Sequence, residues 1–296
     1  MNKKLKIILI LGVAIVILAA TALASWYLSN HNVAVLDPKG VVAEDQRSLL
    51  VTSTLLMALV VVPVLFMIFA IAWRYREGNK KAKYSPELAG SRIAEAIWWL
   101  IPLAIIIVLA GLTYTSSHRL DPYRAITSDK PPLKVQVIAL QWKWLFLYPE
   151  EHVASVNYLP LPTDRPIDFT ITADAPMNSF WIPQLGGQIY AMPGMSTKLH
   201  LQASEPGDYR GSSANLSGKG FAGMTFTAHA TPQQEFDAWV VATRNSANQM
   251  TLDSYEELAK PSTDVKPASY AFPASYEGLY DTVVMKYMTP RKSEGQ

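Results

Sequence analysis

The sequence contains no cysteine among its 296 residues. This absence excludes disulfide scaffolds, thiolate zinc sites, iron–sulfur clusters and cysteine nucleophiles. It also excludes a lipid anchor attached to a cysteine at the end of the N-terminal apolar segment. Any chemistry performed by this chain must therefore use other side chains.

Charged residues are also scarce, at 17% of the chain against about a quarter in typical soluble proteins, while 50% of residues are apolar. This deficit points to a membrane protein. The mean hydropathy is only +0.11, so a large water-soluble part must balance the membrane part. The net charge of +2 gives no support to a nucleic-acid partner, which would normally show as a strongly basic surface.

Three long apolar stretches lie in the first 120 residues, at about 7–28, 48–73 and 96–117. The second and third carry no charge and reach the roughly 20 residues that a membrane span needs, so they are predicted transmembrane helices. The first follows a lysine cluster and ends in Ala22-Leu23-Ala24, which resembles a signal-peptidase site. Segment 1–28 is therefore a signal peptide or an N-terminal anchor, and both interpretations stay open.

The segment between the two predicted helices, residues 74–95, is basic. Arginines and lysines at positions 74, 76, 80, 81, 83 and 92 outnumber its three glutamates. The positive-inside rule places such a loop in the cytoplasm. Segment 29–47 and everything after about residue 118 are then external.

The external part begins with strand patterns. Residues 167–173 and 198–203 alternate between apolar and polar side chains, which predicts two half-buried strands. In 134–148, the apolar side chains first occupy odd-numbered positions, Val135 and Val137, and later even-numbered positions, Trp142 and Trp144. This shift predicts a bulge near Ala139 or burial on both faces. Short strands at this spacing predict a β-sandwich or barrel over 118–230.

The last part, 231–296, is predicted to be a helical C-terminal extension. Thr231-Pro232-Gln233-Gln234 has the pattern of a capping box at the start of an amphipathic helix. Helical spacing returns at 252–259 and 280–287. The proline-containing segment between these two helices is predicted to be a linker.

Several sequence blocks together resemble subunit II of the haem–copper oxidases, most nearly the quinol-oxidising branch. They are Leu36-Asp37-Pro38-Lys39-Gly40, Lys83-Tyr84-Ser85-Pro86, Gln141-Trp142-Lys143-Trp144, Met177-Asn178-Ser179-Phe180 and Gln188-Ile189-Tyr190-Ala191-Met192. The resemblance implies that the external domain is a cupredoxin-like Greek-key β-sandwich following two transmembrane helices.

The same resemblance implies a function for the chain: subunit II of a proton-pumping terminal ubiquinol oxidase that reduces oxygen to water. The haems and copper would be held by the catalytic subunit I, with which this chain and further small subunits would assemble in membrane lipid. The location implied is the bacterial inner membrane, with the C-terminal domain in the periplasm. No nucleic acid is involved.

Copper-bearing members of this family hold a dinuclear copper centre with one histidine and a Cys-x3-Cys-x3-His-x2-Met run. The matching positions in this sequence are Asn178, Ser213, Ser217, Phe221 and Met224, and Asn215 lies midway between the two lost thiolates. A serine hydroxyl does not replace a thiolate, and phenylalanine has no lone pair. We therefore expect no metal in this chain, and we expect Met224 to be core filler.

Two further sets of residues are candidates for a role in the complex. Glu95, at the cytoplasmic end of the second span, is either a helix-terminal charge or, as the resemblance implies, the entrance of a proton pathway. Trp142 and Trp144 are predicted to share one strand face and to pack against the core or a partner surface, with packing against the catalytic subunit favoured. His200 and His229 are predicted to face solvent or a partner rather than a metal.

Two alternative functions remain. One is a copper-bearing cytochrome c oxidase subunit II, against which the missing cysteines argue. The other is a membrane-tethered, non-enzymatic β-sandwich that binds a periplasmic partner or assists assembly. As a quinol oxidase subunit, the chain itself would offer no residues for a catalytic redox step.

Overall fold

The computed structural model describes residues 19, 22–23, 26–27, 33–79 and 90–288. Most of the predicted signal or anchor segment therefore lies outside the described residues. The same holds for the lysines at 80, 81 and 83 and for the block 83–86.

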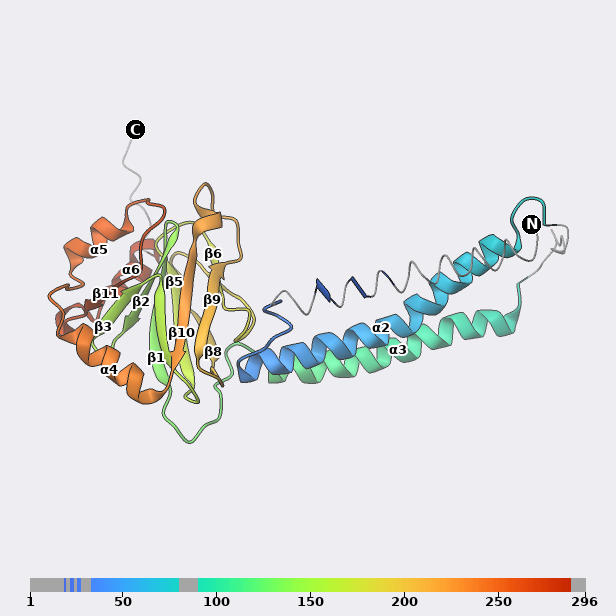
Figure 1. Cartoon of the computed structure of the whole chain (residues 1–296), viewed down its shortest axis with the longest axis horizontal. Helices are drawn as coiled ribbons and strands as arrows, with labels where there is room; N and C mark the ends of the chain where they lie inside the picture. The colour runs from blue at the N-terminus through green and yellow to red at the C-terminus, as the bar shows by residue number, and fades with distance from the viewer. Residues whose placement is uncertain (1–18, 20–21, 24–25, 28–32, 80–89, 289–296) are drawn as a thin grey trace.

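Two long helices, α2 (Val41–Arg74) and α3 (Arg92–Arg119), lie side by side and extend away from the rest of the molecule (Figure 1). Ala43 is the one buried residue of α2, and no residue of α3 is buried. A helix that is apolar on all sides and not covered by protein is suited to hydrocarbon. Both helices are long and apolar enough to cross a membrane, so the chain is membrane-anchored. Each contains its predicted span and continues beyond it at both ends.

The external domain is a β-sandwich, as predicted. A six-stranded sheet has the order β11-β3-β2-β1-β5-β8, and a five-stranded sheet has the order β4-β10-β9-β6-β7. The strands are β1 (Leu133–Leu140), β2 (Lys143–Tyr148), β3 (Val153–Val156), β4 (Tyr158–Pro162), β5 (Ile167–Ala173), β6 (Asn178–Trp181), β7 (Ile189–Ala191), β8 (Thr197–Leu201), β9 (Gly207–Ser213), β10 (Thr225–Thr231) and β11 (Ala268–Ala271). They run across the axis of the helix pair (Figure 1).

Aromatic side chains fill the space between the two sheets. The ring centroids of Trp144 and Phe180 lie 5.4 Å apart, and those of Phe146 and Phe226 lie 5.1 Å apart. Phe180 and Phe226 stack at 5.2 Å. All four side chains are buried, and such pairs add to the free energy gained by removing apolar surface from water.

Segment 134–148 is a hairpin rather than one bulged strand. β1 ends at Leu140, β2 begins at Lys143, and these two residues are antiparallel partners. The shift of the apolar side chains from odd to even positions comes from the reversal of the chain at Gln141 and Trp142, where Trp142 has a φ of 67°. The alternative of burial on both faces is correct for β2, whose six residues are all buried.

The C-terminal extension contains the three predicted helices, α4 (Gln233–Arg244), α5 (Leu252–Ala259) and α6 (Leu279–Met288), with short 3-10 turns at Phe221–Gly223 and Ala274–Tyr276 elsewhere in the domain. The predicted capping box is wrong, because Pro232 is the N-cap and Thr231 still belongs to β10. The predicted linker contains a strand, β11, which pairs antiparallel with β3.

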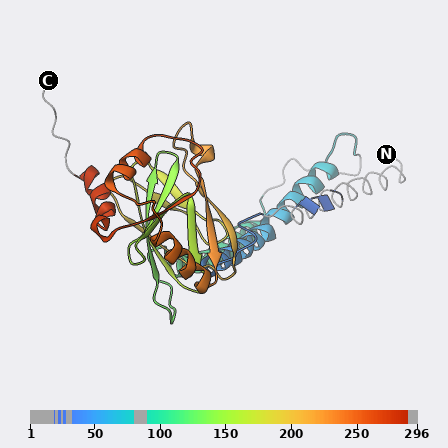
Figure 2. The same ribbon diagram turned by 60° about the vertical axis from the view of Figure 1, so that its left-hand side comes forward.

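After α4, the extension covers the outer face of the six-stranded sheet, on the side of the domain far from the helix pair (Figure 2), while α4 packs on the main sandwich core through Phe236 and Val240. Ile138 and Leu145 of the sheet belong to one buried cluster with Phe272 and Val283 of the extension. The sheet is therefore buried on both faces, which explains why the apolar pattern of β1 and β2 does not simply alternate.

Candidate functional site

The positions that match lost copper ligands gather at one end of the sandwich. Asn178 begins β6, Ser213 ends β9, and Met224 lies just before β10. These three residues are buried. The loop from Ser213 to Met224 also carries the remaining positions, Asn215, Ser217 and Phe221, the last of which begins a 3-10 turn. The spacing of the copper-binding run thus survives as a folded loop.

The polar groups at this end bond to one another. Ser213 Oγ donates to Asn178 Oδ1 at 3.0 Å, and Ser213 N donates to the Met224 carbonyl at 3.1 Å. Asn178 Nδ2 donates to Pro176 O at 2.7 Å, and Asn215 Nδ2 donates to Met177 O at 3.0 Å. These bonds join the end of β9 to β6 without a metal.

These residues do not fit a dinuclear copper centre. The hydroxyl and amide groups of Ser213 and Asn178 already bond to each other, and the ring of Phe221 has no donor atom. Met224 is fully buried in the main core, where a lone thioether serves as packing. Among the described residues, no group of three histidine, cysteine or acidic side chains could hold a metal. No electron-transfer step can be assigned to this end of the domain.

The two tryptophans have separate roles. Trp142 lies in the β1–β2 turn, donates from Nε1 to Ser217 O at 3.1 Å, and packs on Gly220, where an added Cβ would lie 2.4 Å from its ring. Trp144 is fully buried in the sandwich core. The shared strand face is therefore wrong, and Trp144 cannot pack against another subunit. For half-buried Trp142 that contact stays a prediction.

Comparison with known proteins gives matches over most of the chain. Residues 150–231 match the family "Cytochrome C oxidase subunit II, periplasmic domain", and residues 244–291 match "COX Aromatic Rich Motif". Cytochrome bo(3) ubiquinol oxidase subunit 2 of Pseudomonas putida is 50% identical over 256 residues, covering 86% of this chain and 82% of that protein. Ubiquinol oxidase subunit 2 of Acetobacter aceti is 46% identical over 274 residues, covering 91% and 88%.

The chain belongs to the ubiquinol oxidase subunit 2 family. A solved structure, the periplasmic domain of subunit II of cytochrome oxidase of Bradyrhizobium japonicum, is 24% identical with a TM-score of 0.37, covering 40% of this chain and 96% of that one.

In this member of the ubiquinol oxidase subunit 2 family, the aromatic-rich motif is fastened to the sandwich by a buried lysine. Lys143 Nζ donates to the carbonyls of Leu258 and Lys260 at 2.6 and 2.7 Å and to Ser262 Oγ at 2.5 Å. All three of its N–H groups are used, at the C-terminal end of α5, where the helix dipole favours a cation. Burial lowers the pKa of Lys143. In the sequence Lys143 lies between two tryptophans, and nothing in that local pattern predicted that its partners would lie in the distant aromatic-rich motif.

A buried aspartate holds the same motif at a second point. Asp174, just after β5, accepts from Tyr255 OH at 2.7 Å, Lys286 Nζ at 2.7 Å and Tyr287 OH at 2.5 Å. Burial alone would raise the pKa of Asp174, but these hydrogen bonds, with that from Lys286 first, outweigh it and lower the pKa. Burial, and then the bond to Asp174, raises the pKa of Tyr255. Because Tyr255, Lys286 and Tyr287 all belong to the aromatic-rich motif, Asp174 and Lys143 explain how this part of the family attaches.

Glu95 lies in the first turn of α3 and is exposed. The turn is capped by Ser91, whose hydroxyl accepts from Ala94 N at 3.4 Å, and the Glu95 amide donates to Ser91 O at 2.8 Å. An acid at this end of a helix is favoured by the dipole. The position of Glu95 at the start of a helix is thus enough to explain an acidic residue here. Its role as a proton entrance stays a prediction.

The two histidines differ in exposure. His200 is not solvent-facing, because the chain after α3 covers it: its Nδ1 donates to Pro122 O at 2.9 Å, and its Nε2 lies 3.4 Å from Asp168 Oδ1. His229 is partly exposed and pairs with Asp208 at 2.5 Å.

Proposed function

We propose that this chain is the copper-less subunit II of a ubiquinol oxidase complex that oxidises ubiquinol, reduces oxygen to water and moves protons across the membrane. The haems and copper of the complex belong to catalytic subunit I. This chain supplies two membrane helices and an external cap. The proposal rests on the Asn178–Ser213 hydrogen bond, in which two of the copper-ligand positions bond to each other. The relatives of the chain are ubiquinol oxidase subunits.

The proposal is tested by purifying the tagged full chain from its own membranes in mild detergent. A visible spectrum should show haem from a co-purifying subunit, and quinol addition should drive oxygen consumption. A preparation without haem and without oxygen consumption would instead favour the membrane-tethered binding protein. Oxygen consumption driven by reduced cytochrome c would favour the copper-bearing alternative.

We also propose that the loop 74–95 is cytoplasmic and the sandwich periplasmic, in the inner membrane. The arginines at 74, 76 and 92 lie at the far end of the helix pair from the sandwich, which supports this orientation. A periplasm-active reporter fused after Gln296 should be active. Activity of a cytoplasmic reporter at the same position would reverse the topology.

We further propose that Glu95 collects protons at the cytoplasmic surface for the catalytic subunit. Glu95→Gln removes the titrating group with little change in volume, so haem content should stay normal while turnover falls. If Glu95 is only a helix-end charge, the change costs about 0.3–1 kcal/mol of local stability and leaves turnover unchanged. Glu44→Gln is the matched control, because Glu44 occupies the first turn of α2 at the opposite side of the membrane.

A further inference from the structure

The residues that lead into α2, together with the first residues of that helix, run along the sandwich and pair with its backbone. We call residues 37–43 the strap. Lys39 N donates to Gln184 O at 2.7 Å, and Lys39 O accepts from Ser204 N at 2.8 Å. Gly40 forms a β-bridge with Ala203, and Ala43 N donates to Leu185 O at 3.2 Å. The strap thus bonds to two segments of the sandwich, one after β6 and one after β8.

Glycines allow the strap and the sandwich to come this close. A Cβ on Gly40 would lie 2.4 Å from Gln202 O and 3.2 Å from Leu185 Cα. The φ of Gly40 is −146°, which any residue adopts, so contact rather than backbone torsion requires glycine here. On the facing loop, a Cβ on Gly187 would lie 3.0 Å from Gln46 Nε2 of α2, whereas one on Gly186 would be tight against Leu201 of the sandwich, at 2.5 Å, and not against Val42.

Side chains strengthen the same junction. Lys39 Nζ lies 2.8 Å from Glu205 Oε2 and 3.4 Å from Asp37 Oδ1. The hydrogen bond to Glu205 is the main cause of the raised pKa of Lys39. Gln184 Nε2 donates to Asp37 at 3.4 Å. Asp37, Lys39 and Gly40 belong to the block Leu36–Gly40 that the sequence analysis singled out without a role.

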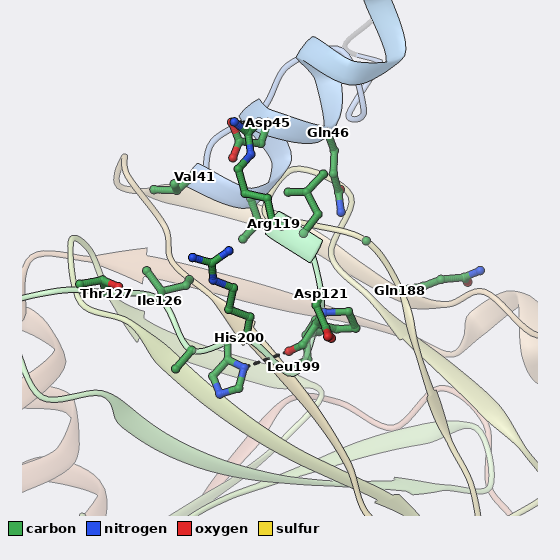
Figure 3. A pocket seen from close by; sticks show the side chains of 16 residues that line it. Val41, Asp45, Gln46, Arg119, Asp121, Ile126, Thr127, Gln188, Leu199 and His200 are labelled. Carbon is green, nitrogen blue, oxygen red and sulfur yellow. Dashed lines mark hydrogen bonds and ion pairs between the residues drawn. The ribbon is translucent and has the colours of Figure 1, made fainter. Parts of the chain in front are cut away.

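The strap leads into α2 without a linker, because Gly40 is both the bridge residue and the N-cap of the helix. The other connection, residues 120–132 between α3 and β1, contains no helix or strand. It touches the sandwich through Pro122 and His200, beside a cavity of about 230 Å³ that lies between α2, the end of α3 and β8 (Figure 3). Asp45 of α2 pairs with Arg119 of α3 at 3.0 Å on the rim of this cavity. The connection 120–132 is thus held to the sandwich by side-chain hydrogen bonds, from His200 to Pro122 O and from Arg165 to Pro131 O, whereas the strap pairs with the sandwich through its backbone.

We propose that the strap fixes the orientation of the external domain on the membrane helices, and that Lys39 and Gly40 are positioning residues for the assembled oxidase. This role is additional to the proposed function. Only the turnover measurement in the test below depends on the proposed function. It assigns a mechanical role to the block Leu36–Gly40: to present the sandwich to the other subunits in one orientation.

The test compares Gly40→Val with Gly223→Ala in the full chain, purified with the subunits that accompany it and placed in nanodiscs. Gly223 is a matched control because a Cβ there meets nothing within 4 Å. Hydrogen–deuterium exchange is measured on peptides covering 37–43, 202–206 and, as an internal reference, β1 and β5. Quinol-dependent oxygen consumption is measured per haem.

We expect exchange in 37–43 and 202–206 to rise at least tenfold in Gly40→Val, with β1 and β5 unchanged and turnover below that of Gly223→Ala. Unchanged exchange and turnover would overturn the proposal, and so would a uniform rise across the sandwich, since that would show general unfolding. If Gly40→Val does not accumulate, Lys39→Ala carries the same comparison. A wild-type preparation without haem would refute the proposed function, while the exchange data would still decide the role of the strap.

Discussion

Two regions of the external domain handle buried polar groups in opposite ways. At the copper-ligand end, neutral groups such as Asn178 and Ser213 bond to each other over short distances. On the outer face of the six-stranded sheet, Lys143 and Asp174 bury full charges, and each has three partners contributed by the C-terminal extension. The bonds at the copper-ligand end join two strands of the sandwich, while those of Lys143 and Asp174 attach the C-terminal extension to it.

The difference predicts how much stability each region loses when one polar group loses its partner. A neutral group that loses its partner costs about 1–3 kcal/mol, whereas each hydrogen bond to a charged group contributes about 1.5–3 kcal/mol, and Lys143 and Asp174 have three each. The attachment of the extension should therefore be the more sensitive of the two regions to single substitutions.

The largest effect is expected for Asp174→Ala. It leaves the buried hydroxyl of Tyr255 without its acceptor and removes two more hydrogen bonds to the carboxylate, from Tyr287 and from the half-exposed Lys286, so the free energy of unfolding should fall by about 3–5 kcal/mol. Thermal unfolding of the purified full chain, followed by tryptophan fluorescence, measures this loss. Asp253→Ala is the control, because Asp253 is an exposed carboxylate of α5. Equal losses in both variants would contradict the special role of Asp174.

Lys143→Met should come next. The thioether keeps most of the buried chain length but donates nothing to the carbonyls of Leu258 and Lys260, so unfolding should become easier by about 2–3 kcal/mol. Protease cleavage within the extension should increase accordingly. Lys198→Met, on the exposed side of β8, should leave both the stability and the cleavage pattern unchanged.

A smaller loss should follow acidification. The pKa of Asp174 is lowered in the folded protein, so its stabilisation is complete above its ordinary pKa of about 3.9 and is lost as the pH falls through the lower, folded-state pKa. The unfolding temperature of the wild type should thus drop between about pH 5 and pH 2, and Asp174→Asn should lack this part of the drop. Parallel curves for the two proteins would show that Asp174 does not titrate in this way.

At the copper-ligand end, Ser213→Ala should cost about 1–2 kcal/mol, because Asn178 Oδ1 loses its donor in a buried place. Its neighbour Ser212, partly exposed on the same strand, provides the control Ser212→Ala. Chemical denaturation of the full chain compares the two. A cost as large as that of Asp174→Ala would erase the contrast between the regions.

The smallest effect, none, is expected from adding copper to the full chain expressed without its partner subunits. The residues at the ligand positions offer one thioether and no thiolate or imidazole, so no coloured dinuclear centre should form. Metal content after desalting and a visible spectrum test this. Two tightly bound copper ions per chain would disprove it.

Patterns within one segment predicted much of this architecture. Uniformly apolar runs gave α2 and α3, period-two alternation gave β5 and β8, and helical spacing gave α5. Asn178 and Ser213, two positions that the family resemblance matches to copper ligands, lie within hydrogen-bonding distance of each other.

The errors share a physical cause, which is that the deciding contacts are distant in sequence. Trp142 adopts a left-handed turn without glycine or asparagine to signal it, and Gly220 beneath its ring makes room for it. Nothing in the local sequence marked Lys143 and Asp174 as buried attachment points, because their partners lie more than 80 residues further along the chain. β11 lies among prolines, and it pairs with β3 and with the distant segment 248–250.

That pairing has a consequence for biogenesis. β3 (Val153–Val156) is synthesised well before its outer neighbour β11 (Ala268–Ala271). Until then the six-stranded sheet has an open, apolar edge of the kind that invites pairing with other chains. A nascent chain of this protein therefore depends on protection of that edge until its C-terminal segment has been synthesised and has closed the sheet.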